Sequence, residues 1–179
     1  PAGLTVADEL DAPLAPPLLL RSGQRDLAYA DYGPRDGRPV MFMHCWGGSR
    51  LHLPADVQPL YAHSLRIIVP ERPGLGFSSM TEEHSLEACP ADVERLADHL
   101  GIDRFDVLGH TMGSIIAIAV ARRVPGRVRS LTLVSPLAPL RGLADLQGML
   151  PVAKLLAGIG LRMPAAAPTL LRLLIGRVR

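Results

Sequence analysis

The chain has 179 residues, of which 48% are apolar, so a folded domain with a buried core is expected rather than disorder. Its formal charge of +2 comes from interspersed basic and acidic residues, which gives no reason to expect a nucleic-acid partner. Cys45 and Cys89 have no Cys or His nearby at metal-ligand spacing, so neither a disulfide framework nor a metal or cofactor is expected. We expect a cytoplasmic protein and leave secretion open, because a chain that begins at Pro1 need not retain its leader.

Short apolar runs follow an irregular, Pro- and Ala-rich lead-in at residues 1–17. Six of them have strand length, at residues 18–20, 27–30, 40–43, 67–69, 105–108 and 131–134. The last four are almost continuously apolar, as in parallel strands covered on both faces, whereas the first two suit an antiparallel hairpin at one edge.

Two helices are predicted between these strands. Apolar residues recur at helical spacing over residues 85–100, and Gly101 ends that helix. Residues 112–123 are apolar nearly all round, which predicts a helix buried against the sheet. Strands that alternate with helices predict an α/β fold, with a doubly wound, mostly parallel sheet over residues 18–140.

Residues 141–179 differ in composition, with Leu, Ala and Arg dominant and no further strand pattern, so they predict a second, helical module. Lys154 and Arg162 interrupt its apolar stretches before either reaches the roughly 20 residues that span a bilayer. A membrane partner is therefore not expected, although a basic amphipathic helix on a membrane or partner surface stays as an alternative.

The segment from Val107 to Ser114 lies where a predicted buried strand becomes a predicted buried helix. In a nucleophile elbow the central residue adopts a strained conformation, and the positions two before and two after it must be small. Gly109 and Gly113 meet this requirement around Thr111. The simpler alternative is an ordinary tight turn. A dinucleotide-binding or P-loop glycine motif is excluded by the spacing and by the missing Gly-Lys-Ser/Thr.

Two further loops have glycines after predicted strands. Residues 43–50 can bring a backbone N–H close to the elbow, and we assign that donor to Trp46, whose ring either lines a pocket or covers the core. His44 is expected to brace this loop. Residues 69–78 concentrate turn-forming residues after the fourth strand.

With these three motifs in order, Gly33 to Leu140 resembles the N-terminal half of bacterial α/β hydrolases of the esterase, lipase and epoxide-hydrolase type. The family motifs read His-Gly-x-Pro-Gly, Pro-Asp-x-x-Gly-x-Gly-x-Ser and Gly-His-Ser-x-Gly-Gly. The resemblance implies that Thr111 is at the nucleophile position and that the N–H groups of Trp46 and Met112 form the oxyanion hole. It also implies a small apolar ester-like substrate under a helical cap that begins near Arg141, and no cofactor.

Each motif departs from the family pattern. Cys45 replaces a glycine, Gly47 a proline, Glu71 an aspartate, Ser114 a glycine and Thr111 the nucleophilic serine. The extra methyl group and β-branching of threonine predict impaired acyl transfer. Ser114 is expected to face away from the apex of the elbow, and Cys45 to be an inert thiol without a partner base.

A hydroxyl nucleophile needs a base, and in this fold the triad acid and histidine follow later strands. After Ser135 the sole carboxylate is Asp145, and no histidine follows His110, which is expected to flank the elbow with its ring directed away from Thr111. The other histidines are expected to be solvated or to pack, at His52, His63, His84 and His99.

Two hypotheses follow from this missing triad. Either the chain is the N-terminal two thirds of a hydrolase whose last two strands are absent, or it is a non-catalytic relative that binds a ligand or partner. In both, a strand at residues 131–134 built for burial becomes a sheet edge, which predicts self-association.

Overall fold

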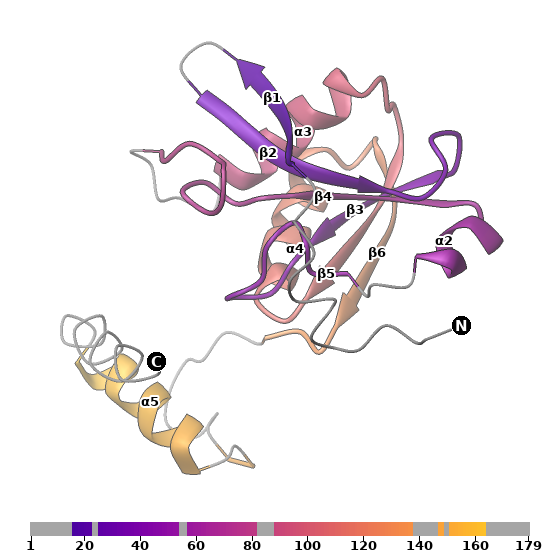
Figure 1. Ribbon diagram of the computed structural model, residues 1–179. Helices are drawn as coiled ribbons and strands as arrows, with labels where there is room; N and C mark the ends of the chain where they lie inside the picture. The colour runs from indigo at the N-terminus through magenta and orange to yellow at the C-terminus, as the bar shows by residue number, and fades with distance from the viewer. Residues whose placement is uncertain are drawn as a thin grey trace, which may run out of the picture. The chain divides into compact units, whose positions relative to one another are not determined.

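The computed structural model describes residues 16–22, 25–53, 57–81, 88–137, 147–148 and 151–163. The chain divides into two units, residues 1–137 and 138–179, which are considered separately. The elements of the first unit are β1 (Leu18–Ser22), β2 (Arg25–Tyr32), β3 (Arg38–Met43), α2 (Gln58–Ala62), β4 (Leu65–Pro70), α3 (Ala88–His99), β5 (Phe105–His110), α4 (Gly113–Arg123) and β6 (Val128–Val134) (Figure 1). The second unit contains α5 (Pro151–Arg162).

A six-stranded mixed sheet with the order β1-β2-β4-β3-β5-β6 forms the centre of the first unit. β1 and β2 form an antiparallel hairpin at one edge, and β2 is also antiparallel to β4. β3 is parallel to both β4 and β5, and β5 is parallel to β6. The predicted α/β class, the six strands and the edge hairpin are therefore confirmed.

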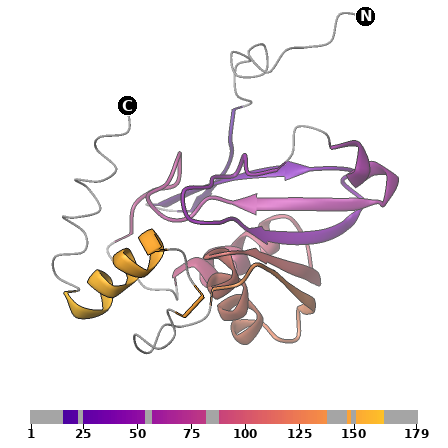
Figure 2. The same cartoon turned by 90° about the horizontal axis from the view of Figure 1, so that it is seen from below.

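Alternation along the strands divides the apolar residues between the two faces of the sheet, because successive side chains point to opposite sides. Met41 and Met43 belong to the larger core cluster, which includes Ile68 and the apolar residues of α3 and α4. Phe42 belongs to a smaller cluster with Ile67 and Val69, against which Leu60 of α2 packs. Helices α3 and α4 thus cover one face, as the view from below also shows (Figure 2).

The helices differ from their predicted bounds at the N-terminal ends. α4 begins at Gly113 instead of residue 112, because Met112 is its N-cap. α3 begins at Ala88, and the preceding predicted residues 85–87 lie outside the described part of the chain. The five-residue helix α2 was missed, since a single turn started by a proline leaves no periodic signal.

β6 is the outermost strand next to β5, and it is more exposed than predicted. Leu131 is 38% exposed and Val134 is 44% exposed, where coverage of both faces was expected. β6 contacts β5 and α4 but remains largely exposed, so the expectation of a strand buried on both faces is wrong.

Of the expected lead-in at residues 1–17, the structure describes positions 16 and 17. The expected start of the cap, residues 141–146, lies outside the described residues. Among the described residues, no helix combines the length and hydropathy that a transmembrane span requires.

Candidate functional site

The turn between β5 and α4 places Thr111 in the left-handed region, with φ of 50°. For a β-branched residue this conformation costs on the order of 1–3 kcal/mol, so the surroundings must hold it in place. The Thr111 N–H donates to the carbonyl of Val134 at 3.0 Å, and the Thr111 carbonyl accepts from the N–H of Ser114 at 3.0 Å. The strained residue is therefore fixed both to β6 and to the first turn of α4.

Positions 109 and 113 must be glycine because the turn leaves no room for a side chain at either of them. A Cβ on Gly109 would lie 2.6 Å from Ser114 Cα and 2.7 Å from Ala117 Cβ. A Cβ on Gly113 would lie 2.0 Å from the carbonyl oxygen of Met43. The second clash is with backbone, which cannot rotate away, so the β3 loop and the start of α4 can approach this closely only at a glycine.

The N-terminus of α4 lies directly after the strained residue. Met112 is its N-cap, and the positive end of the helix dipole is therefore next to Thr111. Ser114 is fully buried, and its hydroxyl donates to the carbonyl of Gly109 at 3.2 Å. The Ser114 hydroxyl therefore stabilises the turn and is inaccessible to a substrate.

The loop after β3 has a buried start and an exposed middle. His44 is 1% exposed, and its Nδ1 lies 3.0 Å from the carbonyl oxygen of Cys45. Burial lowers the pKa of His44 below its usual value, with the hydrogen bond to Cys45 acting in the opposite direction. Trp46 is 65% exposed, so its ring does not cover the core, and Gly47 has a positive φ of 75°.

The loop after β4 is built around Glu71, which is 1% exposed. Its Oε1 accepts from Arg50 Nη1 at 2.8 Å, and its Oε2 accepts from the N–H of Phe77 at 2.9 Å. A Cβ on Gly76 would lie 2.2 Å from Oε2, so the loop closes over the carboxylate only because this position is glycine. Glu71 thus joins the β3 and β4 loops, in place of the aspartate of the family motif.

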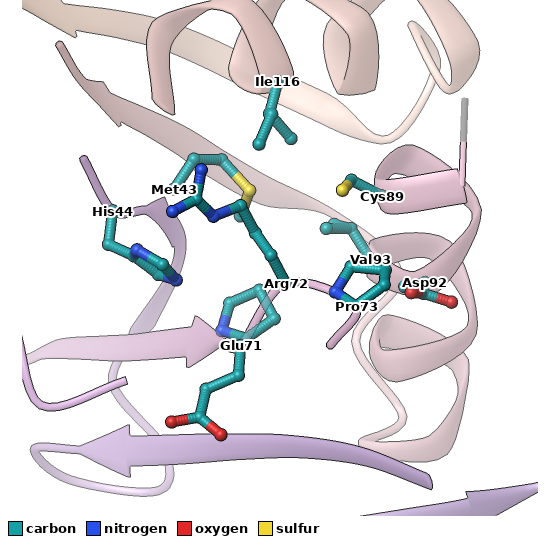
Figure 3. Close-up of a pocket in the computed structure, with 10 residues that line it drawn as sticks. Met43, His44, Glu71, Arg72, Pro73, Cys89, Asp92, Val93 and Ile116 are labelled. Carbon is teal, nitrogen blue, oxygen red and sulfur yellow. The ribbon is translucent and has the colours of Figure 1, made fainter. Parts of the chain in front are cut away.

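A pocket lies where the ends of β3 and β4 meet α3 and α4 (Figure 3). His44 Nε2 and Arg72 Nε are buried in this region without a hydrogen-bond partner among the described residues. Neither Thr111 nor Trp46 belongs to the lining, which consists of Met43, His44, Pro70, Glu71, Arg72, Pro73, Cys89, Asp92, Val93 and Ile116. The pocket therefore borders the turn at Met43 and His44, but Thr111 does not line it.

The structure brings together three side chains that the sequence analysis treated separately. Cys45 Sγ lies 3.8 Å from His52 Nε2, and His52 Nε2 lies 3.2 Å from His110 Nδ1. The expectation that Cys45 has no partner base is therefore not met, whereas His52 packs as expected, beside Phe42 and His110. The signal that could have revealed this group is a Cys and a His in one short loop, with a second His at the end of a strand.

In the part of the chain that the structure describes, no base is hydrogen-bonded to Thr111. Its side chain makes no hydrogen bond to any histidine or carboxylate in the described ranges, and Asp145 lies outside them. His110 directs its ring to His52 instead.

A protein-family model and individual relatives both match this chain. The model of one protein family, described as the alpha/beta hydrolase fold, matches residues 38–164. The chain is 35% identical over 122 residues to a non-heme chloroperoxidase of Streptomyces lividans, covering 67% of this chain and 44% of that protein. It is 32% identical over 126 residues to a non-heme haloperoxidase of Rhodococcus erythropolis, covering 69% and 45%. The chain therefore spans less than half the length of these relatives.

Solved structures agree. A probable hydrolytic enzyme from Pseudomonas aeruginosa superimposes with a TM-score of 0.61 at 26% identity, covering 74% of this chain and 48% of that one. A thioesterase domain from the curacin biosynthetic pathway has a TM-score of 0.63 at 23% identity, covering 83% and 62%, which shows the fold alone.

The sheet order and the positive-φ turn between β5 and α4 define an α/β protein of the hydrolase architecture. Since the family match includes most of its residues, this chain belongs to the α/β-hydrolase fold family, related to esterases and haloperoxidases.

Proposed function

We propose that the β5–α4 turn and the β3 loop form a hydrolase-type acyl-transfer site for a small apolar ester-like substrate. Thr111 is at the nucleophile position, and the N–H groups of Trp46 and Met112 are the donors for the oxyanion. The observation that carries this proposal is the φ of 50° at Thr111, held between two glycines that admit no Cβ. A bifunctional esterase/perhydrolase of Acinetobacter calcoaceticus, 30% identical over 117 residues, supports the same reaction class.

We further propose that this 179-residue chain does not turn over esters by itself. No base is hydrogen-bonded to Thr111 among the described residues, and an unactivated hydroxyl is a weak nucleophile. The chain is then a hydrolase scaffold in a non-catalytic state, able to bind a ligand or partner. Residues 141–179 are the start of its cap in this proposal.

Hydrolysis of a chromogenic short-chain ester tests the non-catalytic state. We expect the chain and Thr111→Ala to give the same rate, because neither has an activated hydroxyl. A clear excess for the unaltered chain would show that Thr111 is a working nucleophile.

Cysteine substitution tests the nucleophile position independently of turnover. We expect Thr111→Cys to be alkylated by iodoacetamide much faster than Ser114→Cys, because position 111 precedes a helix N-terminus while position 114 is fully buried. Peptide mass spectrometry distinguishes either new thiol from Cys45 and Cys89. Equal rates at the two positions would leave the nucleophile assignment without support.

We also propose that β6 pairs with β6 of a second copy of this chain. The strand is the last of the described sheet, and Leu131 and Val134 are exposed on it. Unpaired edge strands with apolar side chains favour such association.

A further inference from the structure

Cys45, His52 and His110 form a three-residue cluster at the ends of two neighbouring parallel strands. Cys45 and His52 lie in the loop after β3, and His110 is the last residue of β5. All three side chains are half-buried, and one potential ligand atom from each lies within 4.8 Å of the others. The acyl-transfer proposal uses none of these side chains.

Two of the three separations are close to the edge lengths of a tetrahedral metal centre. Zinc–sulfur bonds of about 2.3 Å and zinc–nitrogen bonds of about 2.0–2.1 Å place sulfur roughly 3.6 Å from nitrogen and two nitrogens roughly 3.3 Å apart. The Cys45 Sγ–His52 Nε2 distance is 3.8 Å, and the His52 Nε2–His110 Nδ1 distance is 3.2 Å. The remaining pair, Cys45 Sγ and a His110 ring nitrogen, lies within 4.8 Å.

The loop holds two of the three ligands in place before any ion binds. The Gly48 N–H donates to the carbonyl of Cys45 at 3.1 Å, and the His52 N–H donates to the carbonyl of Ser49 at 3.0 Å. The His52 ring also packs beside Phe42, with ring centroids 6.0 Å apart. Such preorganisation lowers the entropic cost of binding.

From these contacts we propose that Cys45 Sγ, His52 Nε2 and His110 Nδ1 bind a divalent transition-metal ion, with zinc as the best match. One thiolate and two neutral imidazoles suit zinc and its neighbours, whereas magnesium and calcium need oxygen ligands. Three protein ligands leave the fourth position of a tetrahedron open for water or another exogenous ligand. Binding releases the thiol proton, because the thiolate is the ligand.

A direct hydrogen bond between the two imidazoles, with a neutral thiol beside them, is the competing explanation of the same distances. Both arrangements accommodate 3.2 Å between nitrogens, but only the metal site requires all three side chains together. The two explanations therefore differ in stoichiometric metal uptake and in the state of the Cys45 sulfur.

Cobalt titration of the complete chain tests the proposal, because tetrahedral cobalt with a thiolate ligand has intense visible bands and a sulfur-to-metal charge-transfer band. We expect one equivalent to bind and zinc to displace it. Cys45→Ser should abolish the charge-transfer band, and His52→Ala or His110→Ala should weaken binding at least tenfold. Cys89→Ser and His63→Ala change the same residue types outside the cluster and should bind like the unaltered chain.

A second measurement needs no substitution and so does not depend on how the variants fold. Zinc should slow alkylation of Cys45 at least tenfold while leaving Cys89 unchanged, as read by peptide mass spectrometry. Absence of stoichiometric cobalt binding, or equal alkylation of Cys45 with and without zinc, would overturn the site. Neither readout involves ester hydrolysis, so failure of the acyl-transfer proposal would leave this result unaffected.

Discussion

Gly113 shows how one absent methyl group decides the geometry of the turn. The β3 loop approaches α4 so closely that a Cβ here would lie 2.0 Å from the carbonyl oxygen of Met43. Because both groups belong to backbone that is hydrogen-bonded into the sheet or the helix, the clash can be relieved only by separating the two elements. The residue therefore controls the position of the β3 loop relative to Thr111.

We expect Gly113→Ala to lower the free energy of unfolding by at least about 2 kcal/mol, the usual size of an overpacking defect. Gly126→Ala is the matched control, since a Cβ there has nothing within 4 Å. Urea denaturation of both variants measures the difference. Similar stability of the two variants would contradict the close approach.

His44 makes folding dependent on pH. Burial lowers its pKa in the folded state, whereas the unfolded chain titrates near 6.5. Below about pH 6.5 the unfolded state therefore binds a proton that the folded state does not, and stability falls as the pH falls. Above that pH the histidine is neutral in both states and contributes no dependence.

Lowering the pH from about 7.5 to about 5.5 should decrease the free energy of unfolding of the unaltered chain more than that of His44→Gln. We expect the two decreases to differ by up to about 1.4 kcal/mol. His63→Gln, at an exposed position, serves as control and should retain the steeper dependence. Urea titrations at the two pH values check this. A decrease in His44→Gln as large as in the unaltered chain would exclude His44 as the source.

At the scale of elements, the β3 and β4 loops are joined by one buried ion pair. The side chains of Arg50 and Glu71 are 5% and 0% exposed, and the carboxylate also accepts the N–H of Phe77. Neutralising Glu71 removes a charged partner of the buried Arg50 guanidinium, which is costly. The shape of both loops therefore depends on Glu71.

We expect Glu71→Gln to cost about 3–5 kcal/mol of stability. Glu94→Gln is the matched control, because it removes an ion pair with Arg123 on the surface. The Glu94 side chain is 33% exposed and the Arg123 side chain 47%, so this change should cost about 0–1 kcal/mol. Thermal or urea denaturation compares the two variants. Equal losses would mean that the Arg50–Glu71 pair does not hold the loops together.

At the scale of the whole molecule, the exposed edge at β6 bears on whether two copies of the chain associate. β6 is parallel to β5 on one side and has no further strand beside it among the described residues. A strand rich in β-branched and apolar residues in this position is a template for pairing with another chain.

We expect sedimentation velocity to show concentration-dependent dimers, which Leu131→Lys should weaken because a charge on the edge opposes pairing. Tyr61→Lys also replaces an exposed apolar residue, but on α2, and should leave association unchanged. A monomer at all concentrations, or equal weakening by both substitutions, would argue against pairing through β6.

The six strands, the helices α3 and α4 and the turn at Thr111 could be predicted from the sequence, because they depend on local properties. Strand-length apolar runs, helical periodicity at α3 and α4, and two glycines spaced around residue 111 are readable within short windows. The cost of a side chain at Gly109 or Gly113 also follows from the turn itself. An edge strand at residues 131–134 follows from the sequence, but the exposure of Leu131 and Val134 could not be predicted, since burial depends on which elements cover a strand.

Taken alone, the sequence determined the α/β class, the strand–turn–helix at Thr111 and the absence of a histidine after His110. Only the tertiary structure decided that Cys45, His52 and His110 meet. β3 and β5 are neighbours in the sheet although β4 and α3 separate them in the chain. Contacts between such strands arise from hydrogen-bonded pairing of distant segments, and spacing along the chain does not encode that pairing.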